Sequence, residues 1–259
     1  MYILETYKLK GSKNMAVDVT LGQVANELND VILRFYTWER PTLSLGKHQK
    51  ASDVDFDYLE ENGFDIVRRP SGGRAVLHWD EVTYSTIIPR GHELFKLGVL
   101  ELYNLISKII VAGLNKLGYP VELTTGKNKP SSHICFQMPS AYEITLNGTK
   151  VVGSAQTRTQ DYILQHGSIV LIPHEEIKHC FKSTKNLDIP LIGLYDYAYN
   201  DFLRIVESLK EAFENYFGRG REIDVNLQTK VLEISTEFEK NFVVIKDEIV
   251  AMKEKEVGL

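Results

Sequence analysis

The sequence has little cysteine and no long apolar run. Its two cysteines, Cys135 and Cys180 among 259 residues, provide no disulfide framework, so both are expected to be free thiols in a reducing compartment. No stretch reaches the ~20 apolar residues that a membrane-spanning helix requires. The first residues, MYILETYKLKGSKN, lack the basic-then-apolar order of a secretion signal. These absences predict a cytoplasmic protein with no membrane partner.

The sequence also has little net charge. Its 30 basic and 35 acidic residues give a formal charge of −5, so it lacks the basic surplus that is typical of nucleic-acid-binding domains. We therefore expect no nucleic-acid partner. Basic residues do gather locally, as Arg68, Arg69 and Arg74. Such a cluster is predicted to steer an acidic partner protein toward this part of the surface.

The composition is that of an ordinary globular protein. Hydrophobic residues make up 43% of the chain and charged residues 25%, which argues against a disordered or fibrous protein. There is no internal repeat, low-complexity tract or long Pro/Gly/Ser linker to mark a domain boundary. We therefore predict a single domain over residues 1–259, with a mainly helical part from about residue 198.

Hydrophobic periodicity and turn signals predict the elements of the N-terminal half. Asn14 is expected to cap the first helix, and Ser52 or Asp53 the second, because these side chains can accept hydrogen bonds from free backbone N–H groups. A tight, glycine-containing loop over 70–73 is expected to join two strands. The expected helices span 14–29 and 52–62, and the expected strands span 31–38, 64–70, 74–78 and 82–89.

The C-terminal half begins with the longest helical pattern, from Leu94 to Leu117, which is expected to pack across a sheet. Asn147-Gly148 is the signal for a type I′ hairpin, and it places Lys150 just inside a strand, where it is not expected to be part of the core. The polar segment 125–132 is a candidate flap. The other expected elements are strands over 163–172 and 242–245 and helices over 202–217 and 227–240. This mixture predicts an α+β fold with a mixed β-sheet flanked by helices.

Gly72-Gly73, between Arg69 and Arg74, is the first candidate for chemistry. Glycines let backbone N–H groups approach a ligand closely, although an ordinary hairpin turn would use the same residues. The pattern is neither a P-loop nor a dinucleotide-binding motif.

The stretch HEEIKH, from His174 to His179, is similar to the zinc-binding HExxH motif but spaces its histidines five residues apart. On a helix such residues lie about 140° apart and cannot share a metal ion. We expect no metal site.

Cys135 and Lys150 form the next candidate. A thiol becomes a good nucleophile when a neighbouring cation lowers its pKa, and a lysine ammonium can do this. The alternative is a buried structural thiol, and this alternative is favoured for Cys180, which follows a predicted helix beside His179 and Lys182.

Four segments, in order, resemble the lipoate-protein ligase and octanoyltransferase superfamily, within the biotin/lipoate ligase fold. They are RFYTWERPTLSLGKHQ, RRPSGGRAVLH, EVTYS, and NGTKVVGSAQTR with LQHGS, and they lie between Asn14 and Leu171. After Asn14-Met15-Ala16 the family commonly has Leu-Asp-Glu, whereas this chain has Val17-Asp18-Val19. Beyond Leu171 the resemblance fades.

The segment CFQMPSAYEITLNGTK distinguishes two branches of this superfamily. ATP-dependent lipoate ligases usually carry an Asn-Asp segment before the hairpin, and this chain does not. The segment instead resembles the corresponding segment of the octanoyltransferases of the LipM type, in which the cysteine becomes acylated. The resemblance implies Cys135 as the nucleophile and Lys150 as its catalytic partner.

The resemblance also implies a site, a reaction and partners. The implied donor is octanoyl-acyl carrier protein, and the implied acceptor is a lysine of a lipoyl domain, such as that of the glycine-cleavage H protein. Transfer from thioester to amide runs downhill, so no ATP or other cofactor is expected. Val76 or Val152 could hold the acyl tail. The residues expected to bind substrate are Arg69, Ser71, Gly72, Gly73, Arg74, His78, Gly153, Ser154, Ala155, His166 and Gly167.

Three alternatives to this transferase remain open. An ATP-dependent lipoate-protein ligase would need a nucleotide and would not need Cys135. An octanoyl amidotransferase would take its acyl group from one lipoyl domain and pass it to another. A non-catalytic relative would bind acyl groups without turnover.

Overall fold

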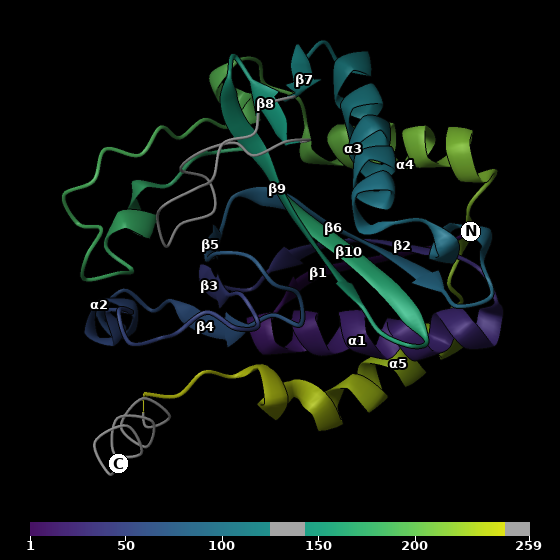
Figure 1. Cartoon of the computed structure of the whole chain (residues 1–259), viewed down its shortest axis with the longest axis horizontal. Helices are drawn as coiled ribbons and strands as arrows, with labels where there is room; N and C mark the ends of the chain where they lie inside the picture. Colours follow the sequence, from purple (N-terminus) through teal and green to yellow (C-terminus); the bar gives the residue numbers. More distant parts are fainter. Residues whose placement is uncertain (125–142, 247–259) are drawn as a thin grey trace.

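The computed structural model describes residues 1–124 and 143–246. Their main feature is an eight-stranded mixed sheet with the order β11-β1-β2-β6-β10-β9-β8-β7 (Figure 1). β1 runs parallel to both of its neighbours, and the other pairs are antiparallel. Its strands are β1 (Tyr2–Leu9), β2 (Ile32–Trp38), β6 (Glu81–Pro89), β7 (Val121–Leu123), β8 (Ile144–Leu146), β9 (Thr149–Arg158), β10 (Tyr162–Val170) and β11 (Arg221–Glu222).

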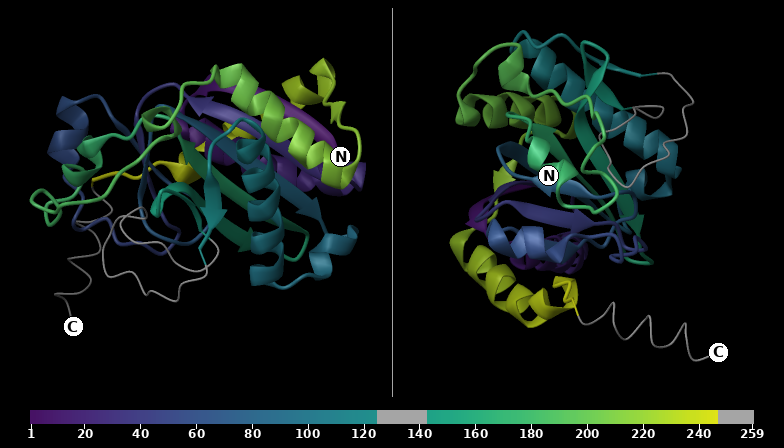
Figure 2. Two further views of the ribbon diagram at one scale, coloured as in Figure 1. Left: turned by 90° about the horizontal axis from the view of Figure 1, so that it is seen from above. Right: turned by 90° about the vertical axis from the view of Figure 1, so that its left-hand side faces the viewer.

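Helices cover both faces of this sheet, as the views in Figures 1 and 2 show. The helices α3 (Val99–Lys116) and α4 (Phe202–Phe217) pack on one face, and α1 (Gly11–Leu28) and α5 (Val225–Phe238) pack on the other. The predicted mixed sheet flanked by helices is therefore confirmed. Among the residues described, no helix is long and apolar enough to span a bilayer.

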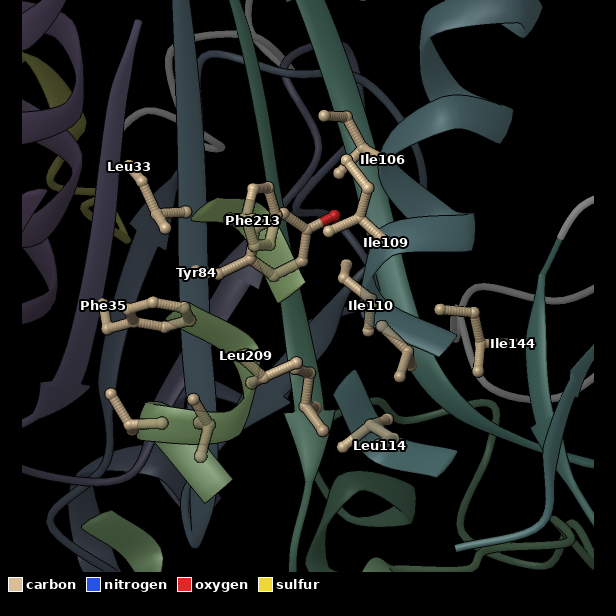
Figure 3. Packing of buried hydrophobic residues seen from close by; sticks show 14 of the residues in the cluster. Leu33, Phe35, Tyr84, Ile106, Ile109, Ile110, Leu114, Ile144, Leu209 and Phe213 are labelled. Atoms are coloured by element: carbon tan, nitrogen blue, oxygen red, sulfur yellow. The ribbon is translucent and has the colours of Figure 1, made fainter. Parts of the chain in front are cut away.

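The face under α3 and α4 is the main apolar core. Leu33 and Phe35 of β2 and Tyr84 of β6 point toward α3 and α4 (Figure 3). Each is fully buried, as are Ile110 of α3 and Phe213 of α4. Because successive side chains of a strand point to opposite faces, the residues between them face α1 instead.

A second, three-stranded sheet stands beside the large one. It has the order β4-β3-β5, with β3 (Thr42–Leu45), β4 (Asp65–Arg68) and β5 (Val76–His78). It packs with the short helix α2 (Phe56–Glu61) and with the segment around Cys180 and Phe181. The loop 70–73 lies between two strands in sequence, as predicted, but because β3 lies between β4 and β5 the loop is not an ordinary hairpin turn. The loop 70–73 instead crosses over one end of β3.

Several predicted boundaries also need correction. Asn14 does not cap α1 but lies inside it, fully buried. Its side-chain amide donates hydrogen bonds to the carbonyl oxygens of Leu9 and Thr37. Asp55, rather than Ser52 or Asp53, caps α2 by accepting the N–H of Tyr58 at 3.2 Å. β1, β3 and β7 lie where no element was predicted, and α3 begins at Val99 because residues Glu93–Lys96 form a separate 3₁₀ turn.

The Asn147-Gly148 hairpin is confirmed, because both residues have positive φ (51° and 79°) as a type I′ turn requires. α4 and α5 lie where two C-terminal helices were predicted. The last predicted strand is wrong: a 3₁₀ turn over Glu239–Phe242 is followed by a single bridge between Val243 and Val67.

Candidate functional site

The candidate site is built on the face of the large sheet opposite the main core. The strand register aligns two rows of side chains across β2, β6, β10 and β9. The first row is Tyr36, Thr83, Ser168 and Gly153, and the second is Arg34, Ser85, His166 and Ala155. Three strand spacings separate the ends of each row, roughly 14 Å. The rows form a floor with large side chains at the β2 end and small ones at the β9 end.

A cavity lies over this floor. It is covered by the small sheet and the loop after β4. Gly73 at one side is exposed and Ala155 is half-buried, whereas Met15 and Tyr36 at the other side are only 1% exposed. The cavity therefore opens near β9 and ends under α1. Its wall includes Met15, Tyr36, Trp38, Ser44, Arg69, Gly73, Val76, His78, Thr83, Gly153, Ser154, Ala155, His166, Gly167 and Ser168.

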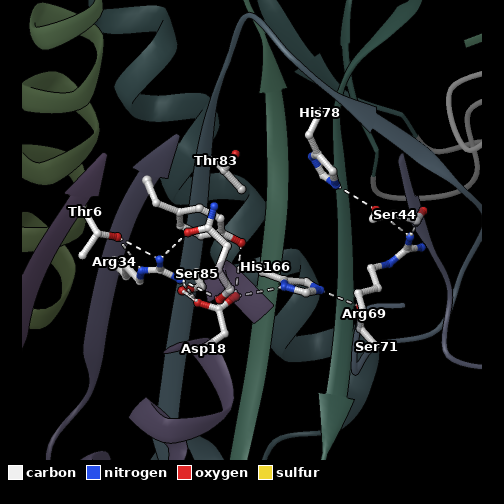
Figure 4. Close-up of polar contacts among 12 residues, drawn as sticks. Thr6, Asp18, Arg34, Ser44, Arg69, Ser71, His78, Thr83, Ser85 and His166 are labelled. Atoms are coloured by element: carbon white, nitrogen blue, oxygen red, sulfur yellow. Dashed lines mark hydrogen bonds and ion pairs between the residues drawn. The ribbon is translucent and has the colours of Figure 1, made fainter. Parts of the chain in front are cut away.

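A buried ion pair anchors the β2 end of the floor. Arg34 Nη1 lies 2.7 Å from Asp18 Oδ1, and both side chains are completely buried (Figure 4). The guanidinium also donates to Thr6 and to Asn14. Burial alone would raise the pKa of Asp18, but the Arg34 charge and a hydrogen bond from His166 outweigh burial and hold that pKa below its usual value. Asp18 is thus a fixed carboxylate inside the protein.

His166 connects this carboxylate to the glycine loop. Its Nδ1 lies 3.2 Å from Asp18 Oδ2, and its Nε2 lies 2.6 Å from Ser71 Oγ (Figure 4). Burial lowers the pKa of His166, and the hydrogen bond to Asp18 offsets this only in part, so the neutral imidazole is favoured. An ionised carboxylate only accepts hydrogen bonds, which assigns the proton to Nδ1 and leaves Nε2 to accept the Ser71 hydroxyl.

This Ser–His–Asp order is similar to that of a serine hydrolase, but the burial of Ser71 argues for a different role. Its side chain is completely buried and lies outside the cavity wall. A nucleophile must reach its substrate. We interpret Asp18 and His166 as groups that position Ser71, and through it the loop that carries Gly72 and Gly73.

Glu81 organises a second buried network beside the first. Its carboxylate accepts hydrogen bonds from Trp38 Nε1 (3.1 Å), His78 Nδ1 (2.8 Å) and the hydroxyls of Thr83 and Ser168. The opposite ring nitrogen of His78 lies 2.7 Å from Ser44 Oγ. The His78 ring also stacks on Trp38, with 4.1 Å between the ring centres. His78 is therefore held in one orientation at the cavity wall.

Two arginines of the basic cluster, Arg68 and Arg69, donate hydrogen bonds to backbone carbonyl oxygens of this region. Arg69 is 5% exposed and donates to the carbonyls of Ser44, Gly72 and Arg74. Arg68 donates to the carbonyls of Gly46 and Gln49. The prediction that Arg68, Arg69 and Arg74 together steer a partner is therefore wrong for Arg69, whose guanidinium is buried.

Gly73 and Gly46 let two backbone segments meet at the cavity. Gly73 has φ +92°, which favours glycine, and a Cβ on Gly46 would lie 2.0 Å from the Gly73 carbonyl oxygen. Only a residue without Cβ fits at Gly46. Gly72 and Arg74 lie in the same loop but outside the cavity wall. The predicted substrate-binding residues are thus brought together around one cavity, some as wall and some as its support.

Lys150 lies apart from that cavity. It is 2% exposed, and its Nζ lies 2.6 Å from Glu143 Oε1. Lys150 lines a neighbouring pocket formed with Leu77, Trp79 and Val170. The expectation that Lys150 is not part of the core is wrong, because its charge is buried and paired. Val152 is also misassigned, since it packs in the main core, whereas Val76 lines the cavity.

Of the two cysteines, only Cys180 lies among the described residues. Cys135 and the candidate flap 125–132 lie outside the described residues. Cys180 is completely buried, and burial raises the pKa of its thiol to about 12. Such a thiol is unreactive near neutral pH.

The two histidines of HEEIKH have separate partners. His174 contacts Asp80 at 2.9 Å and stacks on Trp79, whereas the His179 ring lies against Tyr58. Within residues 1–124 and 143–246, no group of three His, Cys, Asp or Glu side chains is placed to hold a metal ion.

Sequence reasoning missed the two carboxylates that organise the site, Asp18 and Glu81. Both are nearly inaccessible, at 0% and 4% exposure. Asp18 interrupts an apolar stretch of α1, and an acid at a buried helix position is rarely left unpaired. That pattern, together with Arg34 inside an otherwise apolar strand, was the available signal.

Comparison with known proteins agrees with this geometry. Residues 10–186 match the family described as the lipoyl protein ligase A/B catalytic domain. A protein from Carboxydothermus hydrogenoformans named octanoyltransferase LipM is 41% identical over 83% of this chain and 84% of its own length. A protein of the same name from Staphylococcus aureus is 36% identical over 86% of each chain.

Solved structures resemble the fold at low sequence identity. The putative lipoate protein ligase Ta0514 of T. acidophilum superposes with a TM-score of 0.72 at 17% identity, covering 91% of this chain and 94% of its own. A lipoate-protein ligase A bound with ATP gives a TM-score of 0.72 at 18% identity, covering 92% and 95%. With the match to the family and these long alignments, the chain belongs to the lipoyl protein ligase A/B catalytic domain family.

Proposed function

We propose that this chain is an octanoyltransferase of lipoate biosynthesis. It takes the octanoyl group from octanoyl-acyl carrier protein and passes it, through a thioester on Cys135, to a lysine of a lipoyl domain. The glycine-cleavage H protein is the proposed acceptor, and the cytoplasm is the proposed location. The observation that carries the proposal is the 36–41% identity to proteins named octanoyltransferase LipM over more than four fifths of the chain.

The cavity suits a neutral, apolar acyl tail. The polar groups of its floor are already bonded to one another: His166 to Asp18 and Ser71, and Ser168 to Glu81. An acyl tail in the cavity therefore contacts polar groups that already have hydrogen-bond partners, and the carbon atoms of Met15 and Val76. Burying each methylene contributes about 0.8 kcal/mol. The cavity is the proposed acyl site.

The reaction is balanced without a nucleotide. In the first step the Cys135 thiolate attacks the thioester carbonyl, the bond between the acyl carbon and the carrier sulfur breaks, and the carrier leaves as a thiolate. In the second step the acceptor amine attacks the Cys135 thioester, an amide forms, and the amine proton goes to the departing cysteine sulfur. Lys150 is proposed to favour the thiolate by its positive charge. Backbone N–H groups of the Gly72-Gly73 loop are candidate donors to the oxyanion.

Octanoyl transfer to a purified lipoyl domain tests this proposal. Cys135→Ser should abolish transfer from octanoyl-acyl carrier protein, because a hydroxyl is far less ionised than a thiol. The matched control is Cys180→Ser, which should retain transfer. If transfer persists in Cys135→Ser, or if it appears only with ATP and free octanoate, the chain is a lipoate-protein ligase and the proposal fails.

A further inference from the structure

A second pocket adjoins the acyl cavity. It is lined by Lys150, Trp79 and Asp80, together with apolar side chains. Ser168 faces the acyl cavity and Val170, two residues further along β10, faces the second pocket. Two residues of a strand span roughly 7 Å. The two spaces are therefore neighbours along one strand.

Glu81 forms the boundary between them. Its Cα pairs with Val170 across the sheet, and it lines the second pocket. The same carboxylate accepts hydrogen bonds from His78 and Ser168, which line the acyl cavity. Lys150, the proposed partner of the nucleophile, therefore lies on the side of the boundary away from the acyl tail.

We propose that this second pocket receives the side chain of the acceptor lysine. The inference rests on the proposed function, since it assigns a place for the second substrate of the same reaction. A lysine has an apolar stem of four methylenes and an amine at its tip. The pocket offers apolar walls from Leu77, Ile177 and Leu191 for such a stem.

The charge at the entrance of the pocket and its apolar interior fit the two ends of a lysine side chain's path. At the entrance the Asp80 side chain is 49% exposed, and its carboxylate attracts an approaching ammonium group. At the inner end Lys150 is 2% exposed. Its ammonium is paired with the Glu143 carboxylate at 2.6 Å, so the apolar walls, rather than an unpaired like charge, lower the pKa of an incoming ammonium group. The acceptor thus arrives as a cation and reaches the acyl group as a neutral amine, which is the nucleophilic form.

Two substitutions change the pocket without touching the acyl cavity. Ile172 lines the pocket and is 44% exposed, so Ile172→Trp narrows the entrance at little cost to the core. Asp80→Asn removes the charge at the entrance. The matched controls are Val225→Trp, at a 76% exposed apolar residue of α5, and Asp161→Asn, at an exposed acid beyond the other end of β10.

The experiment separates the two half-reactions. Each variant is first acylated with octanoyl-acyl carrier protein and purified, and the acyl-enzyme is then discharged either by a lipoyl domain or by hydroxylamine, which is too small to need the pocket. Ile172→Trp should slow discharge by the lipoyl domain about tenfold or more, since each methylene kept out of the pocket weakens binding about fourfold. Asp80→Asn should slow it about threefold, as expected for one entrance charge. Discharge by hydroxylamine, and both reactions of the controls, should be unchanged.

Two results would overturn the assignment. Ile172→Trp could leave discharge by the lipoyl domain unaffected, or it could slow lipoyl domain and hydroxylamine equally. In either case the acyl-enzyme still forms, so the proposed function survives while the pocket assignment fails. If the native protein forms no acyl-enzyme, the proposed function fails as well.

Discussion

The two faces of the large sheet are made by alternate residues of the same strands, yet they differ in chemistry. On β2, Leu33 and Phe35 enter an apolar core under α3 and α4, whereas Arg34 and Tyr36 face α1 and a buried polar network. A shift of one residue in register would exchange the two sets. The comparison indicates that one face mainly supplies stability, while the other holds the groups that shape the candidate site.

Removing the buried cation should have the largest effect. Arg34→Met leaves the Asp18 carboxylate buried without its guanidinium, and we expect a loss of about 3–5 kcal/mol in the free energy of unfolding. Urea denaturation measures this loss. The double variant Asp18→Leu with Arg34→Met should recover much of the stability, because no unpaired charge remains. Equal stability of Arg34→Met and the native protein would contradict the account.

Truncation on the apolar face should cost stability and leave chemistry intact. Leu209 of α4 is fully buried in the main core beside Gly113 of α3. Leu209→Ala should lower the free energy of unfolding by roughly 2–5 kcal/mol. Below its unfolding temperature, the variant should keep the native rate of octanoyl transfer per folded molecule. A large loss of transfer rate in the folded variant would show that the two faces are not separable in this way.

The closed end of the cavity should set the acyl length. Met15 lies at that end, 1% exposed and packed with Tyr36. Met15→Ala should raise the preference for decanoyl over octanoyl donors by about fourfold for each additional methylene that is buried. Rates with a series of acyl-carrier proteins measure this preference. Met15→Leu, which conserves volume, should keep the native preference. An unchanged preference in a folded Met15→Ala protein would place the end of the cavity elsewhere.

The smallest predicted effect is a pH dependence that comes from His166. Burial lowers its pKa in the folded state, so the unfolded chain binds the proton more readily. Its contribution to stability is therefore complete above the unfolded pKa of about 6.5 and declines as the pH falls from there through the folded pKa. The slope of unfolding free energy against pH in this range should be shallower in His166→Gln than in the exposed-site control His48→Gln. Equal slopes would rule His166 out as the source.

The sequence predicted the fold better than the site. Hydrophobic periodicity located β2, β6, β10, α3 and α4, because these elements bury continuous or periodic apolar surface. It missed β1 and β3, and it did not place β3 between β4 and β5, because the pairing of strands depends on contacts between distant residues. The Gly72-Gly73 loop was found from its glycines, whereas His78 and His166 were found through resemblance.

The rest of the site required three-dimensional information. Asp18, Arg34 and Glu81 are buried polar groups whose partners lie far away in sequence, such as Arg34 with Asp18 and Glu81 with Ser168. The burial of Lys150 depends on Glu143 across the hairpin. Spacing along the chain does not reveal such pairs, although an acid in an apolar helix stretch does indicate that a partner exists.

The central claim is that Cys135 carries the acyl group. Intact-protein mass spectrometry after mixing with octanoyl-acyl carrier protein, without nucleotide, tests it most directly. We predict one octanoyl adduct that hydroxylamine removes, that peptide mapping places on Cys135, and that a lipoyl domain discharges as an amide. Cys180, with a thiol pKa of about 12, should remain unmodified. The absence of an adduct, or an adduct located elsewhere than on Cys135, would contradict the account.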